Sequence, residues 1–155
     1  LFVATAEARD EEMGARIEAH QRRRPARWRT IEAPSQTGKA IAAQLGDARV
    51  VVVDCITLLV SNTMLSLRDE PDPSKAESAV LREVEEIIKV CADGRATFIV
   101  VSNEVGLGLV PNSALGRLYR DLLGRANQVL AAKASKVYWM MAGLPVELKA
   151  LRVGN

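Results

Sequence analysis

Four short apolar runs, separated by segments with helical periodicity, constrain the fold of this chain more than any other feature. The runs span residues 1–6, 50–54, 97–102 and 137–142, and the two middle runs are rich in β-branched residues. None of them alternates cleanly between apolar and polar side chains, which is typical of strands covered on both faces of a parallel sheet. We therefore expect an α/β fold with a mainly parallel sheet flanked by helices.

Apolar side chains recur every three or four residues in four other segments, as on one face of a helix. These segments are 10–23, 36–45, 74–91 and 112–134. Residues 27–33 and 145–151 are candidates for short extra strands, the second at a sheet edge, and the composition of residues 68–75 indicates an exposed loop. The length predicts a single domain over residues 1–155.

The composition is that of an ordinary globular protein, with 48% hydrophobic and 26% charged residues and a formal net charge of +2. A general nucleic-acid-binding protein would be more basic, and no apolar run approaches the ~20 residues of a membrane span. We expect neither nucleic acid nor a membrane as a partner, and a cytoplasmic location. Cys55 and Cys91 lie beside apolar residues and are expected to be buried, reduced thiols.

The segment around His20 is the main candidate for chemistry. His20 is the only histidine, and it is followed by Arg22, Arg23, Arg24, Arg27 and Arg29. Neutral imidazole is nucleophilic near pH 7 and guanidinium groups match phosphate oxygens, so the cluster favours attack on a bound phosphate. Other interpretations stay open: a solvated basic face, an RNA-binding surface with Trp28 stacking on a base, or His20 as a helix C-cap.

Polar residues end three of the apolar runs, where parallel sheets bind their ligands. They are Thr5, Asp54 and the segment 102–104. In phosphate-transfer enzymes an aspartate that closes an apolar run holds magnesium or its water shell. The motif is also common by chance, and a helix N-cap or a loop acid is the alternative for Asp54. The Gly-x-Gly segment after Glu104 permits close approach of a ligand or a flexible connection.

Gly38-Lys39-Ala40 resembles the end of a phosphate-binding loop but does not meet its requirements. Ala33 and Ala40 stand where such a loop needs Gly and Ser or Thr. We expect this segment to form an ordinary helix.

The order of several motifs resembles that of the bifunctional adenosylcobinamide kinase / adenosylcobinamide-phosphate guanylyltransferase family. The resemblance extends from Leu1 to Lys149. Its motifs are Asp10–Met13, Arg16–His20, Arg24–Glu32, Asp54–Thr57 with Asn62, Ser102–Pro111, Arg120–Asp121 and Gly124–Gln128.

The resemblance implies a P-loop NTPase fold of the RecA-like type and two activities in cobalamin biosynthesis. A nucleoside triphosphate, ATP or GTP, phosphorylates adenosylcobinamide, and GTP then transfers GMP to that phosphate to give adenosylcobinamide-GDP. It also implies that His20 carries the GMP as a phosphoramidate and that the enzyme is a homotrimer that uses magnesium, with Asp54 as a possible ligand. The implied nucleotide-binding positions are Ala4, Thr5, Ala6, Gln21, Arg22, Arg23, Arg24, Glu32 and Asp54.

The chain departs from the family pattern at its beginning. The family begins with a strand and a Gly-x-x-x-x-Gly-Lys-Ser loop, which would precede Leu1. We therefore expect an N-terminally truncated chain that binds nucleotide weakly and has unpaired backbone groups on the two strands beside the missing one. The alternatives to the enzyme are a catalytically impaired fragment that retains an assembly surface, and an arginine-rich module that binds RNA or another polyanion.

Overall fold

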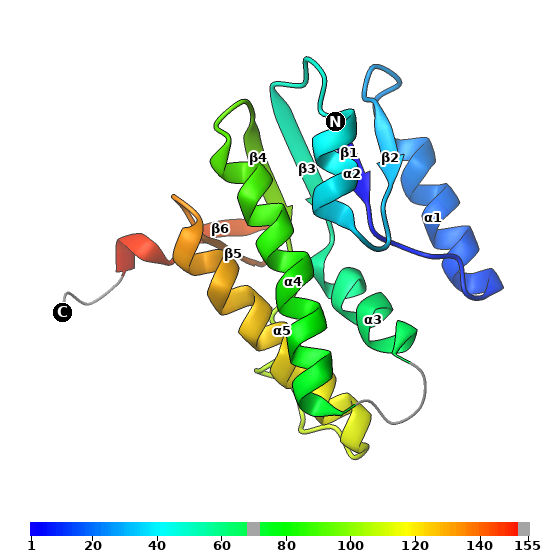
Figure 1. The fold of residues 1–155 in the computed structure, drawn as a ribbon, viewed down its shortest axis with the longest axis vertical. Helices are drawn as coiled ribbons and strands as arrows, with labels where there is room; N and C mark the ends of the chain where they lie inside the picture. The colour runs from blue at the N-terminus through cyan, green and yellow to red at the C-terminus, as the bar shows by residue number, and fades with distance from the viewer. Residues whose placement is uncertain (68–71, 152–155) are drawn as a thin grey trace.

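A parallel four-stranded sheet forms the centre of the molecule (Figure 1). The computed structural model describes residues 1–67 and 72–151. The sheet consists of β1 (Phe2–Ala4), β2 (Thr30–Glu32), β3 (Val50–Asp54) and β4 (Thr97–Val101), in the order β2-β1-β3-β4. Every neighbouring pair is parallel, which confirms the α/β fold with a mainly parallel sheet.

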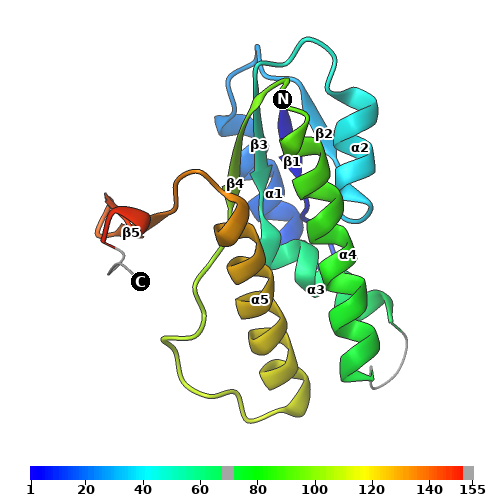
Figure 2. The same ribbon diagram turned by 60° about the vertical axis from the view of Figure 1, so that its left-hand side comes forward.

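Helices cover the two faces of the sheet unequally (Figure 2). Helices α2 (Thr37–Gln44), α4 (Pro73–Ala92) and α5 (Ala114–Lys133) cover one face, and α3 (Ile56–Ser66) packs against α4 and α5. Helix α1 (Glu11–Arg23) lies on the other face. The four expected helices are present with ends shifted by one or two residues. The expected loop at 68–75 lies outside the described residues at 68–71, and α4 includes its last three residues.

The second face of the sheet is only partly covered. Val51 and Val53 of β3 are completely buried toward the helices, whereas Val50 and, on β4, Ile99 and Val101 are exposed. The expectation that the strands are covered on both faces is therefore wrong for β3 and β4. The reason is that α1 packs over Phe2 of β1 and leaves β3 and β4 open on this side.

The expectation of unpaired backbone groups beside a missing strand is also wrong in this structure. Strand β3 pairs directly with β4 along its whole length, from Val50 opposite Thr97 to Asp54 opposite Val101. On its other side, β3 pairs with β1. The described sheet is continuous.

A hairpin follows α5 and stands apart from the main sheet. Within the described residues, strands β5 (Tyr138–Met141) and β6 (Leu144–Glu147) pair only with each other, and the 3₁₀ helix η1 (Lys149–Leu151) follows them. The expectation that residues 137–142 join the parallel sheet, with 145–151 at its edge, is therefore wrong. Ala142 and Gly143 both have positive φ angles, 51° and 79°, which is the backbone of a tight hairpin turn that folds β6 back on β5.

The Gly38-Lys39-Ala40 segment lies inside α2, as expected. A Cβ atom on Gly38 would lie 2.4 Å from the carbonyl carbon of Glu86 in α4, so this glycine allows the two helices to pack closely. The carboxylate of Glu83 accepts hydrogen bonds from the backbone N–H groups of Gln36 (2.7 Å) and Thr37 (3.1 Å). Because a carboxylate already occupies the N-terminus of α2, that end is not free to bind a phosphate.

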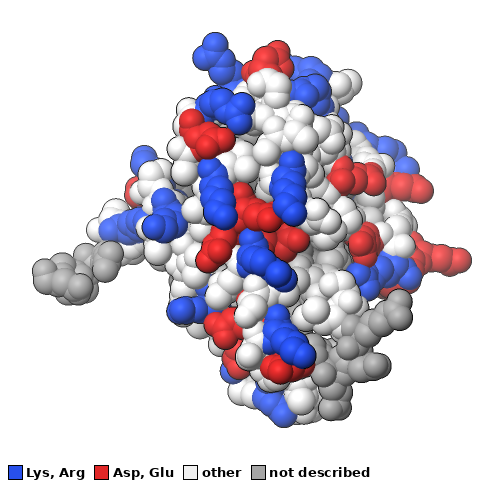
Figure 3. All heavy atoms as spheres, viewed as in Figure 1, with Lys and Arg blue, Asp and Glu red and all other residues white. Residues whose placement is uncertain are grey.

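On the face seen in Figure 3, the lysine and arginine side chains are interspersed with aspartate and glutamate. Both cysteines are free, as expected, but they are half-buried rather than fully buried. Within residues 1–67 and 72–151, no helix combines the length and apolar character that crossing a membrane requires.

Candidate active site

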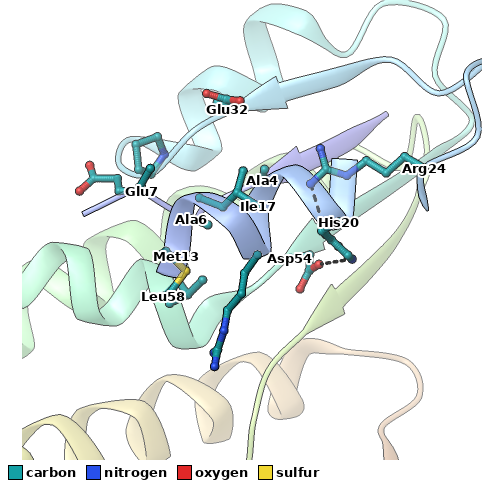
Figure 4. Close-up of a pocket in the computed structure, with 13 residues that line it drawn as sticks. Ala4, Ala6, Glu7, Met13, Ile17, His20, Arg24, Glu32, Asp54 and Leu58 are labelled. Carbon is teal, nitrogen blue, oxygen red and sulfur yellow. Dashed lines mark hydrogen bonds and ion pairs between the residues drawn. The ribbon is translucent and has the colours of Figure 1, made fainter. Parts of the chain in front are cut away.

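A cavity of about 620 Å³ opens where β1, β2 and β3 end, beside α1 (Figure 4). The strand register places Ala4 directly between Glu32 and Asp54, because Ala4 is opposite Glu32 on β2 and opposite Asp54 on β3. The lining consists of Ala4, Ala6, Glu7, Ala8, Met13, Arg16, Ile17, His20, Arg24, Glu32, Pro34, Asp54 and Leu58. Residues distant in the sequence thus meet at the edge of the sheet where ligands were expected.

Helix α1 brings His20 to this cavity. Asp10 caps the helix by accepting a hydrogen bond from the backbone N–H of Met13 (2.7 Å), and Glu11 and Glu12 occupy the first turn, where the helix dipole favours acids. His20 lies in the last turn, and the C-cap is Arg24 rather than His20. Asp10 and the acids of the first turn therefore fix where the helix begins, and its last turn carries His20 to the cavity.

His20 lies between the carboxylate of Asp54 and the guanidinium of Arg24. Its Nε2 atom is 3.8 Å from Oδ2 of Asp54, and its Nδ1 atom is 3.3 Å from Nη2 of Arg24 (Figure 4). The His20 side chain is 50% exposed and that of Asp54 29% exposed, so the ring remains accessible to a substrate in the cavity. An imidazole with a carboxylate and a guanidinium beside it is suited to nucleophilic attack on phosphorus.

An aromatic side chain supports this arrangement from the sheet. Phe2 is only 4% exposed, and Arg24 Cζ lies 4.0 Å from the centroid of its ring. The His20 ring stands edge-on to Phe2 at a centroid distance of 5.7 Å, and Trp28 stacks on Phe2 at 6.3 Å. One face of the Trp28 ring therefore packs against Phe2, and the residue is 43% exposed.

Buried hydrogen bonds hold the strand ends that form the floor of the cavity. Thr5 is completely buried, and its hydroxyl donates to the carbonyl of Cys55 and accepts from the N–H of the same residue, both at 2.7 Å. Asn62 of α3 donates to the carbonyls of Thr5 (2.7 Å) and Pro34 (3.2 Å). These bonds tie the ends of β1 and β3 together next to Asp54.

Not every residue expected at the nucleotide site lines the cavity. Ala4, Ala6, Arg24, Glu32 and Asp54 do, whereas Thr5 lies beneath it and Gln21, Arg22 and Arg23 lie outside the lining. The Gln21 side chain donates to Oε1 of Glu32 at 3.2 Å and so contacts a lining residue.

One member of the arginine cluster stabilises the fold instead. Arg29 donates to the carbonyls of Gln44 (3.1 Å) and Leu45 (2.9 Å) at the end of α2. Guanidinium groups satisfy free carbonyls at helix C-termini in this way. Arg29 is therefore not among the residues that line the cavity beside His20.

Several lining residues were not identified from the sequence. Arg16 and Ile17 precede His20 by four and three residues, so the helical period alone indicates that they share its face. Leu58 comes from α3, a helix that the sequence patterns did not predict because its apolar and small polar side chains are spread around the helix and form no separate polar face.

A second, smaller cleft of about 330 Å³ lies between the segment after β4 and α5. Its lining is mostly polar and consists of Glu104, Gly106, Arg120, Asp121, Gly124, Arg125 and Gln128. Asn103, next to it, donates from its backbone and side chain to Oγ1 of Thr57, both at 3.1 Å. These bonds connect the end of β4 to the start of α3.

The donor set for a metal ion is small. Within the described residues, no three or more His, Cys, Asp or Glu side chains gather as a metal site would require. Of the carboxylates that line the cavity, Asp54 is the one beside His20. A single carboxylate is compatible with magnesium, because that ion commonly uses one or two carboxylates together with substrate phosphates and water.

Comparison with known proteins gives one consistent result. Residues 1–148 match the family model described as cobinamide kinase / cobinamide phosphate guanyltransferase. The chain is 38% identical over 154 residues to a bifunctional adenosylcobalamin biosynthesis protein of Escherichia coli, and equally to one of Salmonella typhimurium, covering 96% of this chain and 85% of each relative. A bifunctional adenosylcobalamin biosynthesis protein of Pseudomonas aeruginosa is 38% identical over 148 residues, covering 96% of this chain and 81% of the relative. Length of match and identity together place this chain in the cobinamide kinase / cobinamide phosphate guanyltransferase family.

Proposed function

We propose that His20 carries the GMP group in the guanylyltransferase reaction of this family. Membership gives the chain two activities in adenosylcobalamin biosynthesis, cobinamide kinase and cobinamide phosphate guanylyltransferase. The observation that supports a histidine carrier is the position of His20 in the cavity, with Asp54 3.8 Å from Nε2 and Arg24 3.3 Å from Nδ1. As the only histidine in the sequence, it is the only imidazole that this reaction can use.

The chemistry divides one transfer into two steps. The neutral ring attacks the α-phosphorus of GTP and pyrophosphate leaves; an oxygen of cobinamide phosphate then attacks the same phosphorus and the P–N bond breaks. A covalent intermediate lowers the barrier because each step is easier than the direct exchange. Arg24 is placed to offset charge that develops on the phosphates.

The nucleotide would lie along the edge of the sheet and across the last turn of α1. In this proposal Ala4 and Ala6 leave room for it, and Gln21, Arg22, Arg23 and Arg24 bind its phosphates. Glu32, at the far side of the cavity from Asp54 (Figure 4), would accept hydrogen bonds from the N1–H and amino group of guanine, a pair of donors that adenine lacks. Thr5 would contribute by holding the floor rather than through its engaged hydroxyl.

Magnesium fits this site through Asp54 and the phosphates. Oδ2 of Asp54 faces His20, which leaves the other carboxylate oxygen for the ion. When bound, magnesium would stabilise the negative charge of the leaving pyrophosphate.

The proposal also covers the fold family and the oligomeric state of the protein. We assign the sheet to the RecA-like P-loop NTPases, with ATP or GTP as the phosphate donor of the kinase step. We also propose a homotrimer in the cytoplasm. The exposed apolar side chains of β5, from Tyr138 to Met141, are a surface that assembly would cover; light scattering on the purified protein measures the oligomeric state.

Labelling tests the histidine carrier directly. Protein incubated with α-³²P-GTP and magnesium should retain label on a denaturing gel, and the label should be lost in acid but not in base, as expected of a phosphoramidate. His20→Asn should abolish it. Arg82→Gln, at an exposed position of α4, is a matched control that should label normally. A normal label on His20→Asn would refute the proposal.

A further inference from the structure

The two nitrogens of the His20 ring have different partners. Arg24 Nη2 lies 3.3 Å from Nδ1, and Asp54 Oδ2 lies 3.8 Å from Nε2. A guanidinium group can only donate hydrogen bonds, so its contact requires the lone pair to be on Nδ1. The proton of the neutral ring is therefore on Nε2, which faces the carboxylate of Asp54.

A shared neighbour fixes the positions of the guanidinium and the imidazole. Both lie against the ring of Phe2, with Arg24 Cζ 4.0 Å from its centroid and the His20 ring edge-on to it. Phe2 is itself buried in β1. The contact between Arg24 and Nδ1 is therefore built on the sheet and not on two free surface side chains.

The hydrogen bonding of Arg24 is incomplete in this arrangement. Its Nε atom is buried and has no acceptor in the described part of the chain. Burial lowers the pKa of Arg24, while the negative charges of Asp54 and Glu32 raise it. Phosphate oxygens are stronger acceptors for a guanidinium than a neutral ring nitrogen, so a triphosphate in the cavity would draw Arg24 from His20 and uncover the Nδ1 lone pair.

We propose that Arg24 and Asp54 select Nδ1 of His20 as the atom that receives the guanylyl group. Arg24 is a positioning residue that keeps the ring proton off Nδ1 and then moves onto the phosphates, while Asp54 holds the proton on Nε2. This inference rests on the proposed role of His20 as the GMP carrier.

The Nδ1 lone pair forms the N–P bond, and the bond between the α-phosphorus and the bridging oxygen breaks, with its electron pair leaving on pyrophosphate. The ring becomes a cation whose Nε2–H is next to the Asp54 carboxylate. Loss of that proton to the carboxylate gives the neutral phosphoramidate, and its return accompanies P–N cleavage when cobinamide phosphate attacks.

The linkage can be read by ¹H–³¹P correlation spectroscopy of the guanylylated protein in base. Phosphorus on Nδ1 is three bonds from one carbon-bound ring proton, Hε1, whereas phosphorus on Nε2 is three bonds from both Hε1 and Hδ2. We expect a single cross-peak. Two cross-peaks would overturn the assignment to Nδ1 and leave the histidine carrier intact, whereas no adduct at all would refute the proposed function itself.

A second measurement isolates the role of Arg24 and needs no nucleotide. Because His20 is the only histidine, ¹⁵N-histidine labelling of the free protein reports on one ring. At about pH 8.5, where an ordinary imidazole is neutral, we expect the wild type and Arg82→Gln to show one tautomer with the proton on Nε2. Arg24→Gln should show averaging between both tautomers and slower labelling by GTP, by at least about tenfold. An unchanged tautomer in Arg24→Gln would overturn the positioning role.

Discussion

Oδ2 of Asp54, at the end of strand β3, lies 3.8 Å from Nε2 of His20, in the last turn of helix α1. Neither residue is near the other in sequence, and the pair exists because β3 ends at Asp54 just where the last turn of α1 crosses the sheet. A carboxylate at this distance is close enough to stabilise the imidazolium that would form in the proposed attack of the ring on phosphorus.

Replacing this carboxylate tests the pair. Asp54→Asn keeps the shape of the side chain but removes its charge, so the rate of guanylylation of His20 should fall by roughly 10²-fold or more. Rapid-quench labelling with α-³²P-GTP measures that rate. The thermal unfolding midpoint should stay close to the wild-type value because Asp54 is partly exposed; an unchanged labelling rate would exclude Asp54 from the reaction.

Substitution of Glu32 tests whether this residue binds guanine. Glu32→Gln replaces a carboxylate acceptor by an amide, so one of the two hydrogen bonds that we propose it accepts from guanine would be lost. The preference for GTP over ATP in guanylyl or adenylyl labelling should fall by roughly 10- to 100-fold. Competition between the two labelled nucleotides gives the ratio, with Glu85→Gln on the exposed face of α4 as the control. Unaltered selectivity in Glu32→Gln would place guanine recognition elsewhere.

The sequence predicted the parallel sheet, and it predicted that polar residues gather at the edge where the cavity lies, because these features follow from local patterns. The run of valines ending at Asp54 and the caps of α1 are visible in a few consecutive residues. The family resemblance added His20 as the carrier, and no structural observation tests that role.

Other parts of the structure depend on contacts that a local pattern does not show. Arg29 looks like a phosphate ligand in sequence but binds the end of α2, since only the fold brings Gln44 and Leu45 to it. Helix α3 was missed because burial on most sides removes the polar face that marks a helix. The sequence of residues 137–142 predicts a strand of the main sheet, whereas they belong to the β5–β6 hairpin, because an apolar run has the same pattern in either sheet.

Two glycines provide a matched test of helix packing. Gly38→Ala places a methyl group within 2.4–2.7 Å of the backbone and Cβ of Glu86, so it should destabilise the protein by about 1–3 kcal/mol. Gly14→Ala, in α1, meets no atom within 4 Å and should stabilise it by roughly 0.5–1 kcal/mol. Urea unfolding of both variants gives the two free energies. Equal effects of the same sign would contradict the close contact between α2 and α4.

Cys91 makes stability depend on pH in the alkaline range. Burial raises the pKa of its thiol from 9.0 to about 11. Between these two values the unfolded chain loses the proton while the folded protein keeps it, so the folded state binds more protons and the free energy of unfolding decreases as the pH rises. The stabilisation is complete below pH 9 and disappears toward pH 11.

Comparing wild type with Cys91→Ala isolates this contribution from the other groups that titrate in base. Cys91→Ala should lower stability near neutral pH, because a half-buried side chain is truncated, and the difference between the two proteins should shrink as the pH rises from 9 to 11. Urea unfolding at several pH values gives the difference, and alkylation by iodoacetamide gives an independent reading. Because the thiolate is the reactive form, Cys91 should react slowly at pH 9 in the folded protein and much faster in urea. A stability difference that stays constant from pH 9 to 11, with fast alkylation of the folded protein, would show that the thiol has an ordinary pKa.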